Sequence, residues 1–353
     1  MDGPGVGSRR EPFGRAGNAD SFLRATVGGP APVAIEFAHA PVLLDESLEW
    51  LALDPRSLVV DGTIGGAGHA EAILDRSAPG GQLIGLDRDA DAIGAARRRL
   101  ARFGERVQLV HASFRDLRTV LDALGVDRVD SVLLDLGVSS HQLDTPARGF
   151  RFAAETADQT PLDMRMDAAA GADAAELLRT ATAEQLEDWL RRYADLRGAR
   201  RLACALVAAR ERAPLRTAAD LLRVIREARV GGGRRHNPAT LVFQALRIAT
   251  NDELAALAEG LDAAIDALRP GGRLVVIAYH SAEDRIVKNR LRDAARGCTC
   301  PPEVPVCVCG GRVRLRVLTR RPTAPGPDEI SHNPRSRSAR LRAAERVEEA
   351  KAA

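Results

Sequence analysis

The stretch Ser57-Leu-Val-Val-Asp-Gly-Thr-Ile-Gly-Gly-Ala-Gly-His69 decides the fold class. A short apolar run ends in an acid at Asp61, and four glycines follow within seven positions. An apolar run bounded by glycines is typical of a buried strand. Glycines let the backbone approach a ligand closely or adopt a positive φ. A helix that begins near Gly68 would point its free N–H groups at such a ligand. We therefore expect a strand, a ligand-binding loop and a helix in succession.

The same rhythm continues outward from this loop. Further apolar runs, each typical of a strand, cover residues 81–87, 107–111 and 129–135, with helical patterns at 70–76 and 90–103. Strands that alternate with helices at this spacing indicate βαβ units and a parallel sheet. Two later runs, 272–279 and 313–318, complete six predicted strands, and the second alternates apolar and charged residues as an edge strand would. The fold class is therefore α/β.

Between the fourth and fifth predicted strands the pattern is helical. Residues 146–170 resemble a loop, and helical patterns without strands then follow at 174–179, 183–192, 195–212 and 217–229, before two more at 240–250 and 253–268. We predict a discontinuous α/β domain made of 37–145 and 236–347, a helical insertion at 146–235, a disordered leader at 1–36 and a tail at 348–353.

Composition places few limits on function. The chain has 353 residues, 45% of them hydrophobic, and a formal net charge of +3, which neither requires nor excludes a nucleic-acid partner. Ten arginines against three acidic residues lie between Arg312 and Arg346, as in a solvated surface or a phosphate-facing patch. No apolar run approaches the ~20 residues that span a bilayer. With no signal-peptide pattern and clustered cysteines, we expect a cytoplasmic protein without membrane contact.

The glycine loop favours a nucleoside cofactor other than a dinucleotide or a nucleoside triphosphate. Its spacing matches neither G-x-G-x-x-G nor the phosphate loop of NTPases. Asp87 ends the second strand, where a carboxylate can bind ribose hydroxyls, although it could instead cap the next helix. Phe114 follows the third strand and either flanks an adenine or belongs to the core. Asp135 ends the fourth strand and either lines the site or caps a helix.

Several longer motifs are similar to one known family. They are His39–Glu46, Asp61–His69, Leu86–Asp89, Leu133–Ser140, Gln142–Asp144, Arg148–Phe152, Pro161–Asp167, Phe243–Ile248, His280–Lys288, 333–338 and Leu341–Arg346. The strings PLDMRMD at 161–167 and HSAEDRIVK at 280–288 are the most specific of these. Over roughly residues 38–347 the chain resembles the ribosomal RNA small subunit methyltransferase H family, the 16S rRNA cytidine N4-methyltransferases.

The resemblance implies a Rossmann-like class I S-adenosylmethionine (SAM)-dependent methyltransferase sheet of seven strands with an inserted helical domain. It implies methyl transfer to N4 of a specific cytidine in the decoding region of bacterial 16S rRNA, within the small ribosomal subunit, and makes 146–235 a candidate RNA-recognition domain. The implied SAM-binding residues are Ala67, Gly68, His69, Asp87, Phe114, Asp135 and Gln142. Ala67 stands where many members have glycine. An alanine is tolerated at this position only if its φ is negative or if the left-handed conformation costs little.

The chemistry of this reaction suggests further candidates. The lone pair of cytosine N4 is delocalised into the ring. A hydrogen-bond acceptor for the amino group would help to localise this lone pair and would take up the proton. We hypothesise that Asp135, or a backbone carbonyl in 136–139, is this acceptor. The base must leave its stack, and His280 could line its pocket or be purely structural. Arg148, Arg151 and the arginines of 312–346 are candidates for phosphate contact.

Four cysteines have a pattern of their own. Cys298, Cys300, Cys307 and Cys309 form C-x-C…C-x-C, which could bind a structural zinc ion, form a reversible disulfide or remain unlinked. Two other functions also stay open from the residues alone. One is a methyltransferase for a small molecule or a protein, and the other is a binding protein without turnover that acts in ribosome assembly.

Overall fold

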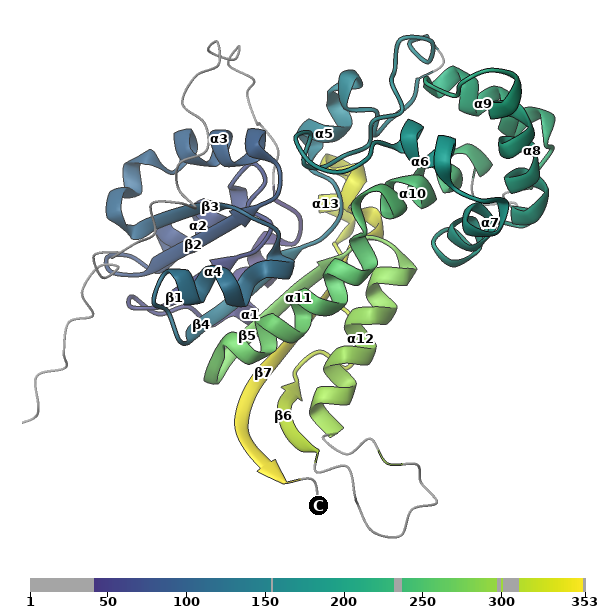
Figure 1. The fold of residues 1–353 in the computed structure, drawn as a ribbon. Coiled ribbons are helices and arrows are strands. Elements are labelled where there is room, and N and C mark those ends of the chain that lie inside the picture. The colour runs from purple at the N-terminus through teal and green to yellow at the C-terminus, as the bar shows by residue number, and fades with distance from the viewer. Residues whose placement is uncertain (1–40, 154, 232–236, 297–299, 301–310, 352–353) are drawn as a thin grey trace, which may run out of the picture.

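A seven-stranded sheet forms the centre of the protein in the computed structural model (Figure 1), which describes residues 41–153, 155–231, 237–296, 300 and 311–351. The strands are β1 (Leu58–Asp61), β2 (Gln82–Asp87), β3 (Val107–His111), β4 (Val129–Asp135), β5 (Leu268–Ala278), β6 (Arg312–Val317) and β7 (Arg340–Lys351), in the order β3-β2-β1-β4-β5-β7-β6. The first five pair in parallel, and β7 runs antiparallel to both β5 and β6. The α/β fold class is thereby confirmed.

The seventh strand is the main element that the apolar pattern did not reveal. β7 is rich in Arg, Ala and Glu, which favour helices. Its place between β5 and β6 overrides this preference, because each side offers a ladder of hydrogen bonds and apolar neighbours. β7 continues to Lys351, and Ala350 and Lys351 pair with Val313 and Arg312 of β6, where the sequence suggested a tail. The edge position predicted for 313–318 is confirmed.

Two layers of helices cover the sheet. On one face, α1 (Leu44–Leu51), α2 (Gly68–Arg76) and α3 (Ala90–Arg99) pack on residues such as Val59 and Leu83. On the other, α4 (Leu117–Ala123), α11 (Glu253–Ala267) and α12 (Ser281–Arg296) pack on their neighbours Val60 and Ile84. Successive strand residues point to opposite faces, so one apolar run supplies both layers. No described helix is long and apolar enough to cross a membrane.

A second group of helices lies beside the sheet (Figure 1) and has its own hydrophobic cluster, with residues from 157 to 246. It contains α6 (Ala174–Thr180), α7 (Ala183–Arg192), α8 (Ala199–Arg212), α9 (Ala218–Glu227) and α10 (Pro238–Asn251). α8 begins four residues later than predicted, because Asp195 and Gly198 have positive φ values of 47° and 84°. α10 contributes to this cluster and leads back to α11, and the exact division into domains stays a prediction.

Candidate functional site

The carboxyl ends of β1, β2 and β4 place three acids at one edge of the sheet. Asp61, Asp87 and Asp135 each end their strand there, which is where open parallel sheets bind ligands. They line or adjoin a cavity of about 680 Å³, within the usual size range of small-molecule sites. The glycine loop and residues 136–140 form one part of its wall, and α10 and the start of α12 form another.

The glycine loop is held in place by backbone hydrogen bonds to the sheet. The N–H of Gly62 donates to the Leu133 carbonyl and that of Ile64 to the Leu86 carbonyl, both at 2.9 Å. A Cβ at Gly62 would lie 2.5 Å from Leu134 Cδ2, so a glycine is needed here for packing. Gly65 has a φ of 47°, in the left-handed region that favours glycine. The loop is therefore fixed before any ligand arrives.

Ala67, Gly68 and His69 form the start of α2, as the sequence suggested. Ala67 is fully buried with φ 60° and ψ 25°, so the left-handed alternative is the one adopted, at a cost of roughly 1–2 kcal/mol. A Cβ at Gly68 would lie 2.9 Å from Pro41 Cγ. His69 Nε2 lies 3.0 Å from the Val42 carbonyl oxygen, an acceptor, so the ring proton is on Nε2. Its Nδ1 lies 3.7 Å from Asp135 Oδ2.

Asp87 connects the glycine loop to the sheet. Oδ2 accepts from the Gly65 N–H and Oδ1 from the Asp89 N–H, both at 2.9 Å. The alternative role as a helix cap is wrong for Asp87, because Asp89 caps α3 by accepting from the Asp91 N–H at 3.0 Å. Burial raises the pKa of Asp87 to about 6, against the lowering effect of its backbone donors.

Phe114 and Gln142 both border the cavity. The Phe114 ring packs directly over Gly260 of α11, where a Cβ would lie 2.3 Å from Phe114 Cδ2. Gln142 is buried, and its amide donates to Asp89 Oδ2 at 2.7 Å while its side-chain oxygen accepts from the Ser139 N–H at 3.0 Å. Its side chain therefore braces the loop after β4 against α3.

Asp135 forms hydrogen bonds through both its side chain and its backbone. Its Oδ1 accepts from the Tyr279 hydroxyl at 2.8 Å, and its backbone N–H donates to Thr63 Oγ1 at 2.7 Å. Its side chain is 22% exposed, toward the cavity. Burial raises the pKa of Asp135 to about 7, with the Tyr279 hydrogen bond lowering it. A carboxylate with this pKa can exchange a proton near neutral pH.

The three acids at this edge lie close enough to repel one another when they are ionised. Burial, partly offset by nearby His69, raises the pKa of Asp61 to about 7, and Asp87 and Asp135 raise it further by repulsion. Burial also lowers the pKa of His69, which disfavours a compensating cation there. A ligand with its own positive charge would relieve this repulsion. The donor set therefore fits a cofactor with sulfonium and ammonium groups.

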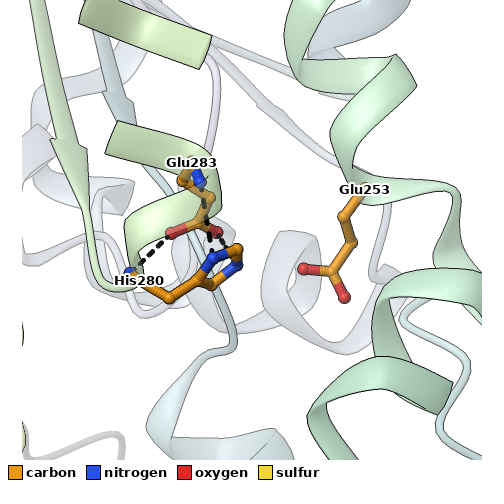
Figure 2. Close-up of side chains that lie close together, drawn as sticks. All are labelled: Glu253, His280 and Glu283. Atoms are coloured by element: carbon orange, nitrogen blue, oxygen red, sulfur yellow. Dashed lines mark hydrogen bonds and ion pairs between the residues drawn. The ribbon is translucent and has the colours of Figure 1, made fainter. Parts of the chain in front are cut away.

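His280 lies beside a network of charged side chains (Figure 2). Glu283 Oε2 accepts from the backbone N–H groups of Tyr279 and His280, at 2.9 and 3.2 Å, which fixes the start of α12. His280 Nε2 lies 3.1 Å from Glu283 Oε1 without the alignment of a hydrogen bond. Nearby, Glu253 binds Arg247 through both its oxygens, at 2.8 and 2.9 Å.

This network contains the donor types of a metal site. The ligand atoms of Glu253, His280 and Glu283 lie within 4.8 Å of one another. However, the Arg247 guanidinium already neutralises Glu253, and it also lowers the pKa of Glu283. We therefore interpret the group as an ion network at the wall of the cavity, in which Arg247 already occupies both oxygens of Glu253.

The predicted phosphate contacts need correction. Arg148 is only 11% exposed, lies 2.9 Å from Asp89 Oδ2 and donates to the Met166 carbonyl, so it holds the loop and is unavailable for RNA. In 312–346, Arg342 is buried against Asp284 and Arg335 pairs with Asp144, so part of the charge of this tract is balanced across the fold, and exposed Arg320, Arg321 and Arg337 remain candidates for phosphate contact. The tertiary partners come from segments far away in the chain, which the local count could not include. Arg151 is 64% exposed beside the cavity.

The cysteine prediction stays untested. Cys298, Cys307 and Cys309 lie outside the described residues, and Cys300 is described alone. A structural zinc ion at these four positions therefore remains a prediction.

Sequence reasoning missed five side chains of the site: Thr63, Arg247, Glu253, Tyr279 and Glu283. Glu283 had a local signal, because it follows the helix-capping position by three residues. Tyr279 stands between a predicted strand and His280, and its role depends on β4 and β5 being neighbours. Arg247 and Glu253 lie at the junction of α10 and α11, which no local pattern places at the cavity.

Known proteins resemble this chain over almost its whole described length. The model of the MraW methylase family matches residues 36–347. Proteins named ribosomal RNA small subunit methyltransferase H from Pelobacter propionicus and Geobacter sulfurreducens are each 51% identical, with 88% of this chain and 99% of each relative covered. The protein of that name from Heliobacterium mobile is 48% identical over 89% of this chain. The chain belongs to the MraW methylase family.

Proposed function

We propose that this protein transfers a methyl group from SAM to N4 of a specific cytidine in the decoding region of 16S rRNA. The single observation that carries the proposal is the acidic, glycine-edged cavity at the carboxyl ends of β1, β2 and β4, in a chain of the MraW methylase family. The names of the 51% identical relatives support an rRNA substrate. We further infer that the substrate is carried by the small ribosomal subunit and that the enzyme works in the cytoplasm.

The loop side of the cavity suits the cofactor. SAM supplies an electrophilic methyl group on a positively charged sulfur. The backbone at Ala67–His69 would approach its amino-acid part, and Asp87 its ribose hydroxyls. Phe114 would flank the adenine, and Gln142 would hold the loop after β4 in place. Asp135 would face the positive charge near the methyl group, and a bound cation there would favour the ionised form of this buried carboxylate.

The other side of the cavity suits a base that has left its stack. Phe152 and Phe243, with ring centroids 4.4 Å apart, line the cavity, as do His280 and Arg247. An aromatic wall can hold a flipped base, and the polar side chains can bind its edge. His280 would line this pocket, and exposed Arg151 would contact phosphate at its mouth. The helices of 146–235 would extend the RNA contact.

The test is methylation of the RNA itself. Purified protein, labelled SAM and small ribosomal subunits that lack the modification are incubated, and the methylated nucleoside is identified by mass spectrometry. We expect N4-methylated cytidine from one decoding-region site. Label in another nucleoside would contradict the specificity and favour another substrate class. Transfer to no nucleoside, with SAM binding intact by calorimetry, would favour a non-catalytic role in ribosome assembly.

A further inference from the structure

Asp135 presents two chemically different oxygens to the cavity. Oδ1 accepts the Tyr279 hydroxyl at 2.8 Å. Within the described residues, no side chain donates a hydrogen bond to Oδ2, and His69 Nδ1 lies 3.7 Å from it. The contact of His69 Nε2 with the Val42 carbonyl leaves Nδ1 without a proton. Oδ2 therefore faces a lone pair and keeps its own acceptor capacity.

Tyr279 cannot easily turn away from this arrangement. It sits directly after β5, whose residue Ile277 is the register partner of Asp135 in β4, so the two strands bring both side chains to the same sheet edge. Glu283 binds the Tyr279 backbone N–H at 2.9 Å. Gly137 packs beside the ring, since a Cβ there would lie 3.4 Å from Tyr279 Cδ2, at ordinary contact distance.

We propose that Tyr279 is a positioning residue for methyl transfer: its hydroxyl fixes the Asp135 carboxylate so that Oδ2 accepts the proton released from cytosine N4. This proposal rests on the proposed function. In the step, the bond between sulfur and the methyl carbon breaks and sulfur keeps the electron pair. The N4 lone pair forms the new bond to carbon. One N4 proton passes to Oδ2, so the products are a neutral thioether, neutral N4-methylcytidine and a protonated Asp135.

The electrostatics of the pocket agree with this role. The titratable groups that face Asp135 or Tyr279 are Asp61 at the end of β1, His69 on α2, Glu283 on α12 and Glu329 on α13 (Pro327–His332). Burial and the nearby carboxylates hold the pKa of Tyr279 well above its usual range, so its hydroxyl stays protonated and remains a donor. The same hydroxyl lowers the pKa of Asp135 and so keeps more of it ionised at neutral pH.

Tyr279→Phe tests the proposal, and Tyr193→Phe is the matched control. These are the two tyrosines of the chain, and Tyr193, at the end of α7, does not border the cavity. Single-turnover transfer to unmethylated small subunits is measured at saturating SAM from mildly acidic to mildly alkaline pH. The free energy of a hydrogen bond to a charged group corresponds to a factor of about ten to a hundred in a rate constant. We expect Tyr279→Phe to slow transfer by about tenfold or more at neutral pH.

The pH profile separates positioning from a structural effect. Transfer needs ionised Asp135, so the rate rises with pH through its pKa. Without the Tyr279 hydroxyl the pKa of Asp135 rises. The acidic limb of the rate–pH profile should therefore move to higher pH by about one unit or more. SAM affinity should stay unchanged when it is measured by calorimetry at a pH above the acidic limb, where Asp135 is ionised in both proteins, and Tyr193→Phe should follow the wild type. An unmoved limb, or a loss of SAM affinity equal to the loss of rate, would overturn the proposal. A wild type that makes no N4-methylcytidine would instead contradict the proposed function.

Discussion

Replacing Gly260 by alanine would test how closely Phe114 is held against the cavity. Gly260 is buried in α11, and a Cβ there would lie 2.3 Å from Phe114 Cδ2, 2.8 Å from Cε2 and 3.2 Å from the Phe114 carbonyl oxygen. Real Cβ contacts are not this short, so the ring must move. Such overpacking costs about 1–3 kcal/mol. The gain from alanine over glycine inside a helix is about 0.8–1.0 kcal/mol. The net change for Gly260→Ala is therefore zero to about 2 kcal/mol of destabilisation.

Gly94→Ala in α3 is the matched control. The nearest atom to a Cβ there is Arg98 Nη1 at 3.7 Å, an ordinary contact. Only the higher helix preference of alanine over glycine remains, so the free energy of unfolding of Gly94→Ala should rise by up to about 1 kcal/mol. The two variants differ by the clash alone. We therefore expect urea denaturation to show Gly260→Ala less stable than Gly94→Ala by about 1–3 kcal/mol.

The same pair of variants tests the place of the adenine. Movement of the Phe114 ring would remove an aromatic contact of about 0.5–1.5 kcal/mol from a ligand beside it. SAM affinity, measured by calorimetry, should then fall by up to about tenfold in Gly260→Ala and stay constant in Gly94→Ala. Equal stabilities would refute the close packing at Gly260. A clear loss of stability with unchanged SAM affinity would refute the placement of Phe114 at the adenine.

Three further changes have outcomes that follow from the contacts. Arg148→Ala should destabilise the fold by about 3 kcal/mol in urea, because it removes the cation beside the buried Asp89 carboxylate. Exposed Arg151→Ala should change stability by less than about 0.5 kcal/mol, and similar urea midpoints for the two variants would contradict this. Asp87→Asn should weaken SAM binding about tenfold by calorimetry, and wild-type affinity would exclude the ribose role. Ala67→Gly removes left-handed strain of about 1–2 kcal/mol but also a buried methyl worth about 0.8 kcal/mol and chain entropy, so its melting temperature should barely move.

The sequence by itself determined six of the seven strands and the edge of the sheet at which the cavity lies. Val107–His111 and Val129–Asp135 were located to the residue, because each is a short, largely apolar run between polar or turn residues. An acid at the end of such a run, next to a glycine loop, can hardly lie elsewhere than the carboxyl edge of the sheet. The family motifs added the cofactor and the substrate, which no periodicity could supply.

Only the tertiary structure decided which side chains meet. β7 is a strand despite its helix-favouring composition, because β5 and β6 lie on either side of it. The Arg148 charge looked unbalanced along the chain, yet Asp89 lies 2.9 Å away across the fold. Tyr279 meets Asp135 across 144 residues of sequence, through the pairing of β4 with β5. Local patterns report how a segment buries its own apolar face, whereas these contacts depend on strand order and register, which bring distant segments together.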